Sequence, residues 1–246
     1  MVAPRSEGRS SPASRSGPHG PFAMDLDRYY AIALGGNRAL AGRMRFWLLH
    51  SDFHCVASFR FRQAARSLYS RSRLIGFLPL VISALWRHRV ATIHHVNIDL
   101  RAQIGPGFYI MHRNMLFIGP VSIGDNCVLH HNVTIGERVA DGDSGVPTLG
   151  DNVWVGPGST IYGDITVGNN VTISAGTVLS KSVPDGSLVA GNPGRIIQRD
   201  YDNRSIINFT VPKSHDAKPG PGGTASQVQH PALGGLDPVD DGGSAG

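Results

Sequence analysis

The stretch that decides the fold is residues 149–179, LGDNVWVGPGSTIYGDITVGNNVTISAGTVL, in which an aliphatic residue returns at every sixth position. The same repeat runs back to residue 98, with a loop before residue 149 and a slip of one residue before Phe117. The repeat positions are Ile98, Ile104, Ile110, Phe117, Ile123, Leu129, Ile135, Leu149, Val155, Ile161, Val167, Ile173 and Leu179. A helix, with its period of about 3.6 residues, does not produce this spacing, whereas short strands joined by tight corners do.

Glycine follows many of these repeat positions, as in Ile104-Gly105, Val155-Gly156 and Val167-Gly168. Because glycine lets the chain bend sharply after a strand, each repeat position can point inward. Three six-residue repeats make one triangular coil, and coils stack at the ordinary strand spacing of about 4.8 Å. The sequence therefore predicts a mainly β protein built on a parallel β-helix of about five coils.

The composition favours one substantial core without disulfide bonds. The chain has 246 residues, of which 41% are hydrophobic and 17% charged. Its two cysteines, Cys55 and Cys127, provide no disulfide framework, and Cys127 falls on an inward position where a buried thiol is expected. A net charge of +5 is compatible with anionic cofactors or lipid headgroups. Aromatic and basic residues are not interleaved as in a nucleic-acid site, so no nucleic-acid partner is expected.

Four regions are predicted along the chain: residues 1–23 disordered, 24–95 α-helical, 96–200 the β-helix, and 201–246 a mostly disordered tail. Residues 1–23 contain no apolar signal segment, which favours a cytoplasmic protein. Apolar residues recur at helical spacing in residues 37–50, 51–70 and 73–89. The pair Ser51-Asp52 is a good N-cap signal for the second of these helices.

The helix predicted at residues 73–89 has two competing interpretations. Its apolar stretch is too short to span a bilayer, and Pro79 lies inside it. In one interpretation the helix packs in an oligomer interface. In the other it lies in a membrane surface, making the protein membrane-associated, because arginines flank the apolar body on both sides. These arginines are Arg71, Arg73, Arg87 and Arg89.

Four strings together resemble the hexapeptide-repeat acyltransferases. They are IGPG at 104–107, HHNVTIG at 130–136, GDNVWVGPG at 150–158 and VAGNPGR at 189–195. The resemblance covers residues 35–200 and is closest to the serine O-acetyltransferase-like branch, which includes sugar O-acetyltransferases of polysaccharide clusters. It implies a left-handed β-helix, an exception to the usual hand of parallel crossovers. It also implies a homotrimer with active sites in the clefts between neighbouring prisms.

The resemblance implies that His112 is the catalytic base, because IGPGFYIM at 104–111 matches the segment leading to the family's catalytic histidine. Imidazole exchanges protons near neutral pH, so it can take the proton of an acceptor hydroxyl that attacks a thioester carbonyl. No serine or cysteine lies in a nucleophile-elbow context, which favours direct transfer. The residue that orients the imidazole is expected to be Asn97, at the aligned position, or Asp99, on the same face of the strand.

His131, or less favourably His130, is expected to hold the acceptor or the donor carbonyl from the next coil. Because adjacent residues in a strand point to opposite faces, only one of the two is expected to serve. The related carbonic anhydrases use a histidine pair four residues apart, and the β-helix of this chain has no such pair. No metal is therefore expected.

Coenzyme A, carrying an acetyl or another acyl group, is the expected co-substrate and should lie along the upper coils. Gly136, Gly158 and Ala175 are small enough for the pantetheine arm to lie against the backbone. Lys181 and Arg195 are expected to meet the anionic phosphates; the competing interpretation makes them solvated surface charges.

The acceptor is predicted from what the sequence lacks. In serine acetyltransferases a loop carries an Arg-His pair that grips the amino acid, whereas the aligned residues 144–146 have neither charge nor imidazole. Met111 stands where the family has Asp. Because buried unpaired charge is costly, the hydroxyl of a sugar or glycoconjugate is the leading prediction. The alternatives are a serine O-acetyltransferase of cysteine biosynthesis and a non-catalytic trimeric scaffold.

Overall fold

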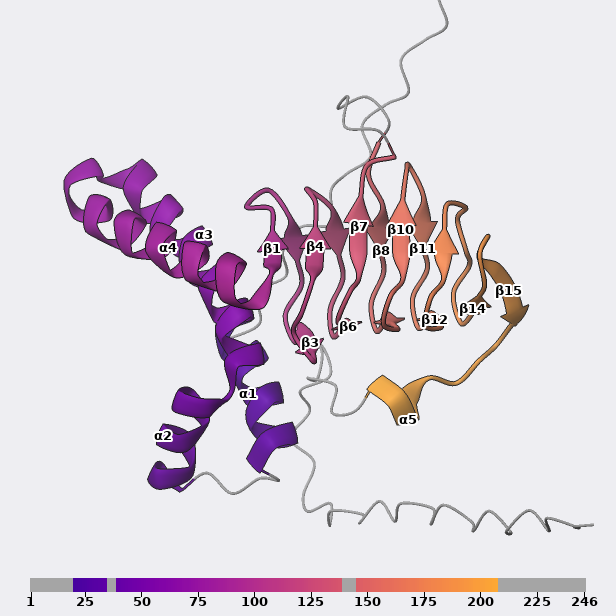
Figure 1. Ribbon diagram of the computed structural model, residues 1–246, viewed down its shortest axis with the longest axis horizontal. Coiled ribbons are helices and arrows are strands. Elements are labelled where there is room, and N and C mark those ends of the chain that lie inside the picture. Colours follow the sequence, from indigo (N-terminus) through magenta and orange to yellow (C-terminus); the bar gives the residue numbers. More distant parts are fainter. Residues whose placement is uncertain (1–19, 35–38, 139–144, 208–246) are drawn as a thin grey trace, which may run out of the picture.

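The computed structural model describes residues 20–34, 39–138 and 145–207 (Figure 1). Four helices gather at one end of a long triangular prism, and a short fifth helix follows the prism in the chain. The helices are α1 (Pro21–Leu34), α2 (Leu40–Leu49), α3 (Ser51–Arg71), α4 (Arg73–His94) and α5 (Arg204–Ile207). Most of the two segments expected to be disordered, 1–23 and 201–246, lies outside the described residues.

The prism has three walls, which we call sheets A, B and C. Sheet A contains β1 (Val96–Ile98), β4 (Leu116–Ile118), β7 (Thr134–Gly136), β10 (Thr160–Tyr162) and β13 (Val178–Leu179). Sheet B contains β2 (Gln103–Ile104), β5 (Ser122–Ile123), β8 (Thr148–Leu149) and β11 (Thr166–Val167). Sheet C contains β3 (Tyr109–Met111), β6 (Val128–His130), β9 (Trp154–Val155), β12 (Thr172–Ile173), β14 (Leu188–Ala190) and β15 (Arg195–Gln198).

The chain visits the three sheets in turn, so three consecutive strands form one coil. Strands of neighbouring coils pair in parallel, and among the described strands only β15 at the far end is antiparallel to its neighbour, β14. In sheet A the stacked inward positions are Ile98, Ile118, Ile135, Ile161 and Leu179, each in register with the next. These side chains fill the prism with a continuous apolar core. The predicted parallel β-helix is confirmed.

The core also contains a cysteine. Cys127 is fully buried, as predicted, and its Sγ donates a hydrogen bond to the carbonyl of Gly150 at 3.2 Å. Burial raises the pKa of this thiol to about 12. A protonated, buried thiol of this kind is a packing residue, because the reactive form of cysteine is the thiolate.

One of the predicted inward positions is wrong. Phe117 points outward from β4 and is 48% exposed, while its neighbours Leu116 and Ile118 are buried. Ile118 is the residue in register with Ile98. The repeat therefore slips by two residues rather than one between Ile110 and Ile118, and the extra residues lengthen the corner that contains His112.

The helical region also begins earlier than predicted. Helix α1 starts at Pro21 rather than near Met24, because proline fits the first turn of a helix, where its missing N–H costs nothing. The N-cap predicted at Ser51-Asp52 is wrong as well, since the cap of α3 is His50 and no side chain bonds the free N–H groups there. Asp52 instead bonds a residue of the β-helix.

Helices α1 and α3 cover the exposed edge of the first coil, where β3 is the terminal strand of sheet C. The hydroxyl of Tyr29 accepts a hydrogen bond from the backbone N–H of Ile110 at 2.9 Å. It lies 3.3 Å from the carbonyl oxygen of the same residue. A strand edge without such partners would leave buried polar groups unsatisfied.

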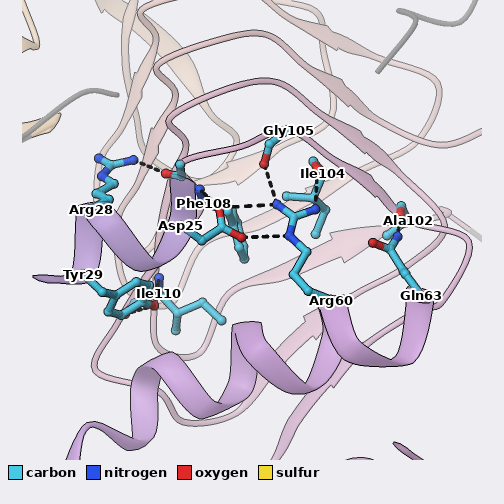
Figure 2. Close-up of polar contacts among 11 residues, drawn as sticks. Asp25, Arg28, Tyr29, Arg60, Gln63, Ala102, Ile104, Gly105, Phe108 and Ile110 are labelled. Atoms are coloured by element: carbon cyan, nitrogen blue, oxygen red, sulfur yellow. Dashed lines mark hydrogen bonds and ion pairs between the residues drawn. The ribbon is translucent and has the colours of Figure 1, made fainter. Parts of the chain in front are cut away.

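A buried ion pair fixes the same helices to the segment before β3 (Figure 2). Arg60 Nε lies 2.8 Å from Asp25 Oδ2, and both side chains are almost inaccessible to solvent. The Arg60 guanidinium also donates to the carbonyls of Ile104 and Gly105, each at 2.7 Å. Asp25 Oδ1 accepts from the N–H of Phe108. Residues 104–108, which lead to His112, are thus held on a rigid support.

Beyond the last coil the chain turns back along the prism (Figure 1). Asn203 Nδ2 donates to the carbonyl of Asn152 at 2.9 Å, and the carbonyl of Ile207 accepts from Arg28 on α1. Residues 199–207 therefore connect the far end of the prism to its helical end.

Candidate active site

One edge of the prism collects the histidines of the β-helix. We call it the histidine edge: the corner where strands of sheet C end and the chain turns towards sheet A. It carries His112 after β3, His131 after β6, Gly158 after β9 and Gly176 after β12. The coils are joined along it by backbone hydrogen bonds, from Asn132 N to Asn114 O, from Gly158 N to His131 O and from Gly176 N to Pro157 O.

The corner at His112 has an unusual backbone. It contains two residues more than the corresponding corners of the other coils, as the register of Ile118 requires. His112 has φ 56° and Met115 has φ 48°, so two side chains other than glycine adopt the left-handed region. This conformation is uncommon for such residues and is often found at functional sites. The His112 side chain is exposed at the tip of this corner.

Arg113, which sequence reasoning missed, fixes the His112 corner to the helices. Its Nη1 lies 2.9 Å from Asp52 Oδ1, and its backbone N–H donates to the same oxygen at 3.2 Å. Its Nε lies 3.3 Å from Nδ1 of His94, the last residue of α4. In the sequence, the one signal related to this contact is Asp52 at the start of a predicted helix, and there it indicates an N-cap and not a partner for Arg113.

Three imidazole rings meet at this corner. The ring centroid of His112 lies 6.1 Å from that of His130 and 6.2 Å from that of His131, and the last two are 6.4 Å apart. Both rings of the adjacent pair thus lie near His112, although the alternation of strand side chains indicated opposite faces; that only one of them serves stays a prediction. His130 ends β6 and His131 lies in the turn, where the alternation of strand side chains no longer holds.

His130 is held in its neutral form. Burial first, and then the neighbouring His112 and His131, lower the pKa of His130 to about 4. Its ring also packs edge to face against Trp154, with centroids 4.8 Å apart. Within the described part of the chain, His130 Nε2 and His131 Nδ1 are buried and have no hydrogen-bond partner. Such nitrogens can bond a ligand.

The two candidates for orienting His112 lie at different places. Asn97 is exposed in the middle of β1, on the outward face of sheet A beside Phe117, its partner in β4. Asp99 lies beyond the end of β1, at the opposite edge of the sheet. Its carboxylate accepts from Arg101 Nη2 and Nε, both at 3.1 Å, and this bond lowers the pKa of Asp99. No hydrogen bond joins either residue to His112 among the described residues.

The residues predicted to bind coenzyme A fall into two groups. Gly158 and Ala175 lie on the histidine edge, and Arg195 is in register with Ala190, the end of β14, at the top of that edge. A Cβ atom added at Gly176, beside Ala175, would meet nothing within 4 Å, so the backbone is open there. Gly136 is the last residue of β7 and Lys181 follows β13, so both lie where strands of sheet A end, away from the histidine edge.

The segment predicted to face the acceptor, residues 144–146, is described only in part. Ser144 lies outside the described residues, and Val146 packs against the apolar core. Met111 is in register with His130 and brings no charge to the corner. No three His, Cys, Asp or Glu side chains are grouped as a metal site within residues 20–34, 39–138 and 145–207.

Two protein families match parts of the β-helix. Residues 147–181 match "Bacterial transferase hexapeptide (six repeats)", and residues 117–139 match "Hexapeptide repeat of succinyl-transferase". The chain is 30% identical over 143 residues to a serine acetyltransferase of Helicobacter pylori, covering 58% of this chain and 78% of that protein. It is 32% identical over 122 residues to serine acetyltransferase 1, chloroplastic, of Arabidopsis thaliana.

The plant relative is much longer than the aligned part. The alignment covers 47% of this chain and 37% of the Arabidopsis protein, so the chain spans well under half the length of that relative. Among solved structures, the serine acetyltransferase of Brucella abortus strain S19 in complex with coenzyme A is similar, with 28% identity and a TM-score of 0.58. That similarity covers 73% of this chain and 67% of the Brucella chain.

Proposed function

The chain belongs to the hexapeptide-repeat acyltransferases of the serine O-acetyltransferase branch, and from this we propose that it transfers an acetyl group from acetyl-CoA to a hydroxyl group. The relatives named serine acetyltransferase favour L-serine as the acceptor. They support this alternative better than the sugar acceptor predicted first from the sequence. The Brucella enzyme bound to coenzyme A supports acetyl-CoA as the co-substrate.

The observation that carries the proposal is the composition of the histidine edge. His112 projects from a lengthened corner within 6.2 Å, ring to ring, of two further histidines. Above them the edge continues as Gly158 and Gly176, both with positive φ and little side-chain cover. A base thus stands at the end of an open strip of backbone, which suits a thin pantetheine arm that ends in a thioester.

His112 acts as general base in this mechanism. An imidazole nitrogen takes the proton of the acceptor hydroxyl while the hydroxyl oxygen attacks the thioester carbonyl carbon. The carbonyl electron pair moves to oxygen and gives a tetrahedral oxyanion. When this intermediate collapses, the carbon–sulfur bond breaks and the departing thiolate takes the proton from His112. The products are the O-acetyl ester and free coenzyme A.

His130 and His131 bind the reacting groups in this proposal. His130 is neutral above about pH 4, so it can donate one hydrogen bond without a charge of its own. A neutral donor aimed at the carbonyl oxygen stabilises the oxyanion as its charge develops. Asn97 is the proposed orienting residue for His112, because Asp99 is already bonded to Arg101.

A second candidate acceptor is the neutral hydroxyl of a sugar. Met111, the residue before His112, is uncharged, and Arg113, the residue after it, is bonded to Asp52. Free serine brings a carboxylate and an ammonium group, whose burial without partners is costly. A sugar brings neither charge.

We propose further that the protein is a cytoplasmic homotrimer. The exposed outward face of sheet A, with Phe117 48% accessible beside the histidine edge, supports a neighbouring prism at that position. The active site would then lie in the cleft between two prisms.

An acceptor assay tests the proposed activity. The protein is incubated with acetyl-CoA and either L-serine or a panel of neutral sugars, and both thiol release and the mass of the acetylated product are measured. The account predicts O-acetylserine. If only sugars are acetylated, the acceptor is a sugar hydroxyl and not L-serine. If no acceptor is acetylated and coenzyme A does not raise the melting temperature, the non-catalytic trimeric scaffold is favoured.

A further inference from the structure

Helix α4 presents a wide apolar face to solvent. Leu74 is 91% exposed, Leu78 64% and Leu85 66%, and these residues recur at the spacing of one helix face. Further exposed apolar residues widen this face: Ile75, Phe77, Val81 and Ile82. Only 17% of the most apolar part of α4 is buried. Soluble monomers seldom expose so large a continuous apolar surface without a partner for it.

The opposite face of α4 is fixed against α3. Gly76, Ser83 and Val90 are buried there. A Cβ atom at Gly76 would lie 2.3 Å from the Cα of Tyr69, so the backbones of the two helices approach each other closely at this point. The hairpin of α3 and α4 projects from the end of the prism (Figure 1). The apolar face therefore cannot turn inward without separating the two helices.

A groove lined by arginines lies between α3 and α4. Arg62 and Arg66 of α3 face Arg73 and Arg87 of α4 across it, with Ser70 and Ser83. Burial lowers the pKa of Arg62, and Arg87 and Arg66 lower it further by repulsion, while Asp99 of the β-helix, which is paired with Arg101, acts in the opposite direction. Nε of Arg62 is buried and has no hydrogen-bond partner among the described residues. The groove gathers cations that repel one another, which indicates a site for an anion.

The hairpin as a whole has a strong excess of positive charge. Residues 51–94 contain seven arginines and a single acidic residue, Asp52. Asp52 is bonded to Arg113 of the β-helix and so does not neutralise the groove. A second copy of the same face would bring arginines against arginines, which is unfavourable.

From the apolar face and the arginine groove together, we propose that the α3–α4 hairpin binds the surface of a membrane that contains anionic phospholipids. The phosphate of a lipid headgroup enters the groove, and the apolar side chains of α4 enter the acyl boundary. By length and composition, the 22 residues of α4 are enough to cross a membrane, so the expectation that its apolar stretch is too short does not hold for the whole helix. Its arginine-free segment 74–86, however, is roughly 20 Å long at 1.5 Å per residue, whereas a bilayer core measures about 30 Å. Because arginines stand at both ends of this segment and its other face packs on α3, the proposal places the helix in the interface.

Vesicle flotation of the full chain tests this site. Vesicles of phosphatidylcholine alone are compared with vesicles that also contain phosphatidylglycerol. We expect binding to the anionic vesicles, little to the neutral ones, and no displacement by inorganic phosphate at physiological concentration. The double variant R66E/R73E should reduce partitioning by more than about tenfold, since each basic residue near an anionic surface contributes roughly 1 kcal/mol, a factor of about five.

Matched control variants show whether vesicle binding depends on the α3–α4 hairpin or on the net charge and apolar surface of the protein in general. R45E/R199E makes the same change of charge away from the groove, and it should bind nearly as the natural chain does. L78Q/L85Q should bind more weakly, whereas L40Q/L48Q, on the exposed part of α2, should not. Size-exclusion chromatography with light scattering should give the same assembly for all variants.

Three results would overturn the proposal. The first is no binding of the natural chain to anionic vesicles. The second is an equal loss in the α2 and α4 variants. The third is a change of assembly in L78Q/L85Q while vesicle binding stays unchanged, which would assign the apolar face to an interface between copies of the chain.

Discussion

Asp52, in the first turn of α3, holds Arg113, the residue that follows His112, through an ion pair of 2.9 Å. The pair connects the helical region to the corner that presents His112, and Arg113 extends the connection to His94 at the end of α4. The orientation of His112 therefore depends on Asp52, which lies 61 positions before Arg113 in the sequence.

D52N should lower kcat for acetyl transfer by about tenfold to a hundredfold, because a shift of about 1 Å in a catalytic group can cost that much. KM for acetyl-CoA should change little, since Asp52 is remote from Gly158 and Gly176. Steady-state kinetics over both substrates measure this. The control D202N removes an exposed ion pair with Arg204 and should leave both constants unchanged. Equal kinetics for D52N and the natural chain would show that Asp52 does not position the corner.

D25A should destabilise the fold by about 3–5 kcal/mol, because it leaves Arg60 buried without its carboxylate partner. It also removes the acceptor for the N–H of Phe108. D25N keeps an acceptor oxygen and should lose less. Urea unfolding gives the comparison, with D202A as the exposed control that should not move the midpoint. If D25A and D202A unfold at the same urea concentration, the stability of the fold does not depend on the ion pair of Asp25 with Arg60.

Stability should fall as the pH is lowered from about 6.5 to about 4. The pKa of His130 is lowered to about 4 in the folded protein. In this window the unfolded chain binds a proton at His130 that the folded chain does not. The stability that neutral His130 contributes is fully present above the pKa of histidine in the unfolded chain, about 6.5, and is lost as the pH falls towards about 4. Melting temperatures at several pH values should show a shallower dependence for H130N, and an identical dependence would exclude His130 as the group responsible.

Most of the fold follows from the sequence, because a six-residue repeat allows few other structures. Phe117 was misplaced because the corner after Ile110 is longer than the repeat by two residues, and the sequence offers two neighbouring apolar residues as alternatives. The early start of α1 at Pro21 was missed because residues 1–23 are rich in proline, serine and glycine.

The candidate site was predicted less completely than the fold. His112, His130 and His131 could be singled out as candidates because histidines are few and lie on consecutive coils; the structure brings their rings together, and their roles stay predictions. The pairing of Asp52 with Arg113 could not be found, because it joins a helix to a coil through tertiary packing alone. Asp99 and Asn97 share a strand face in sequence, yet Asp99 lies past the strand end and pairs with Arg101.

The most direct test of the central claim is the rate of coenzyme A release with H112A, measured at saturating acetyl-CoA and acceptor. The account predicts a fall in kcat of about a hundredfold to ten-thousandfold, the contribution of a positioned general base. The assembly should stay intact, coenzyme A should raise the melting temperature as it does for the natural chain, and H88A on α4 should keep full activity. An H112A variant that turns over at the natural rate would contradict the assignment of His112 as the base.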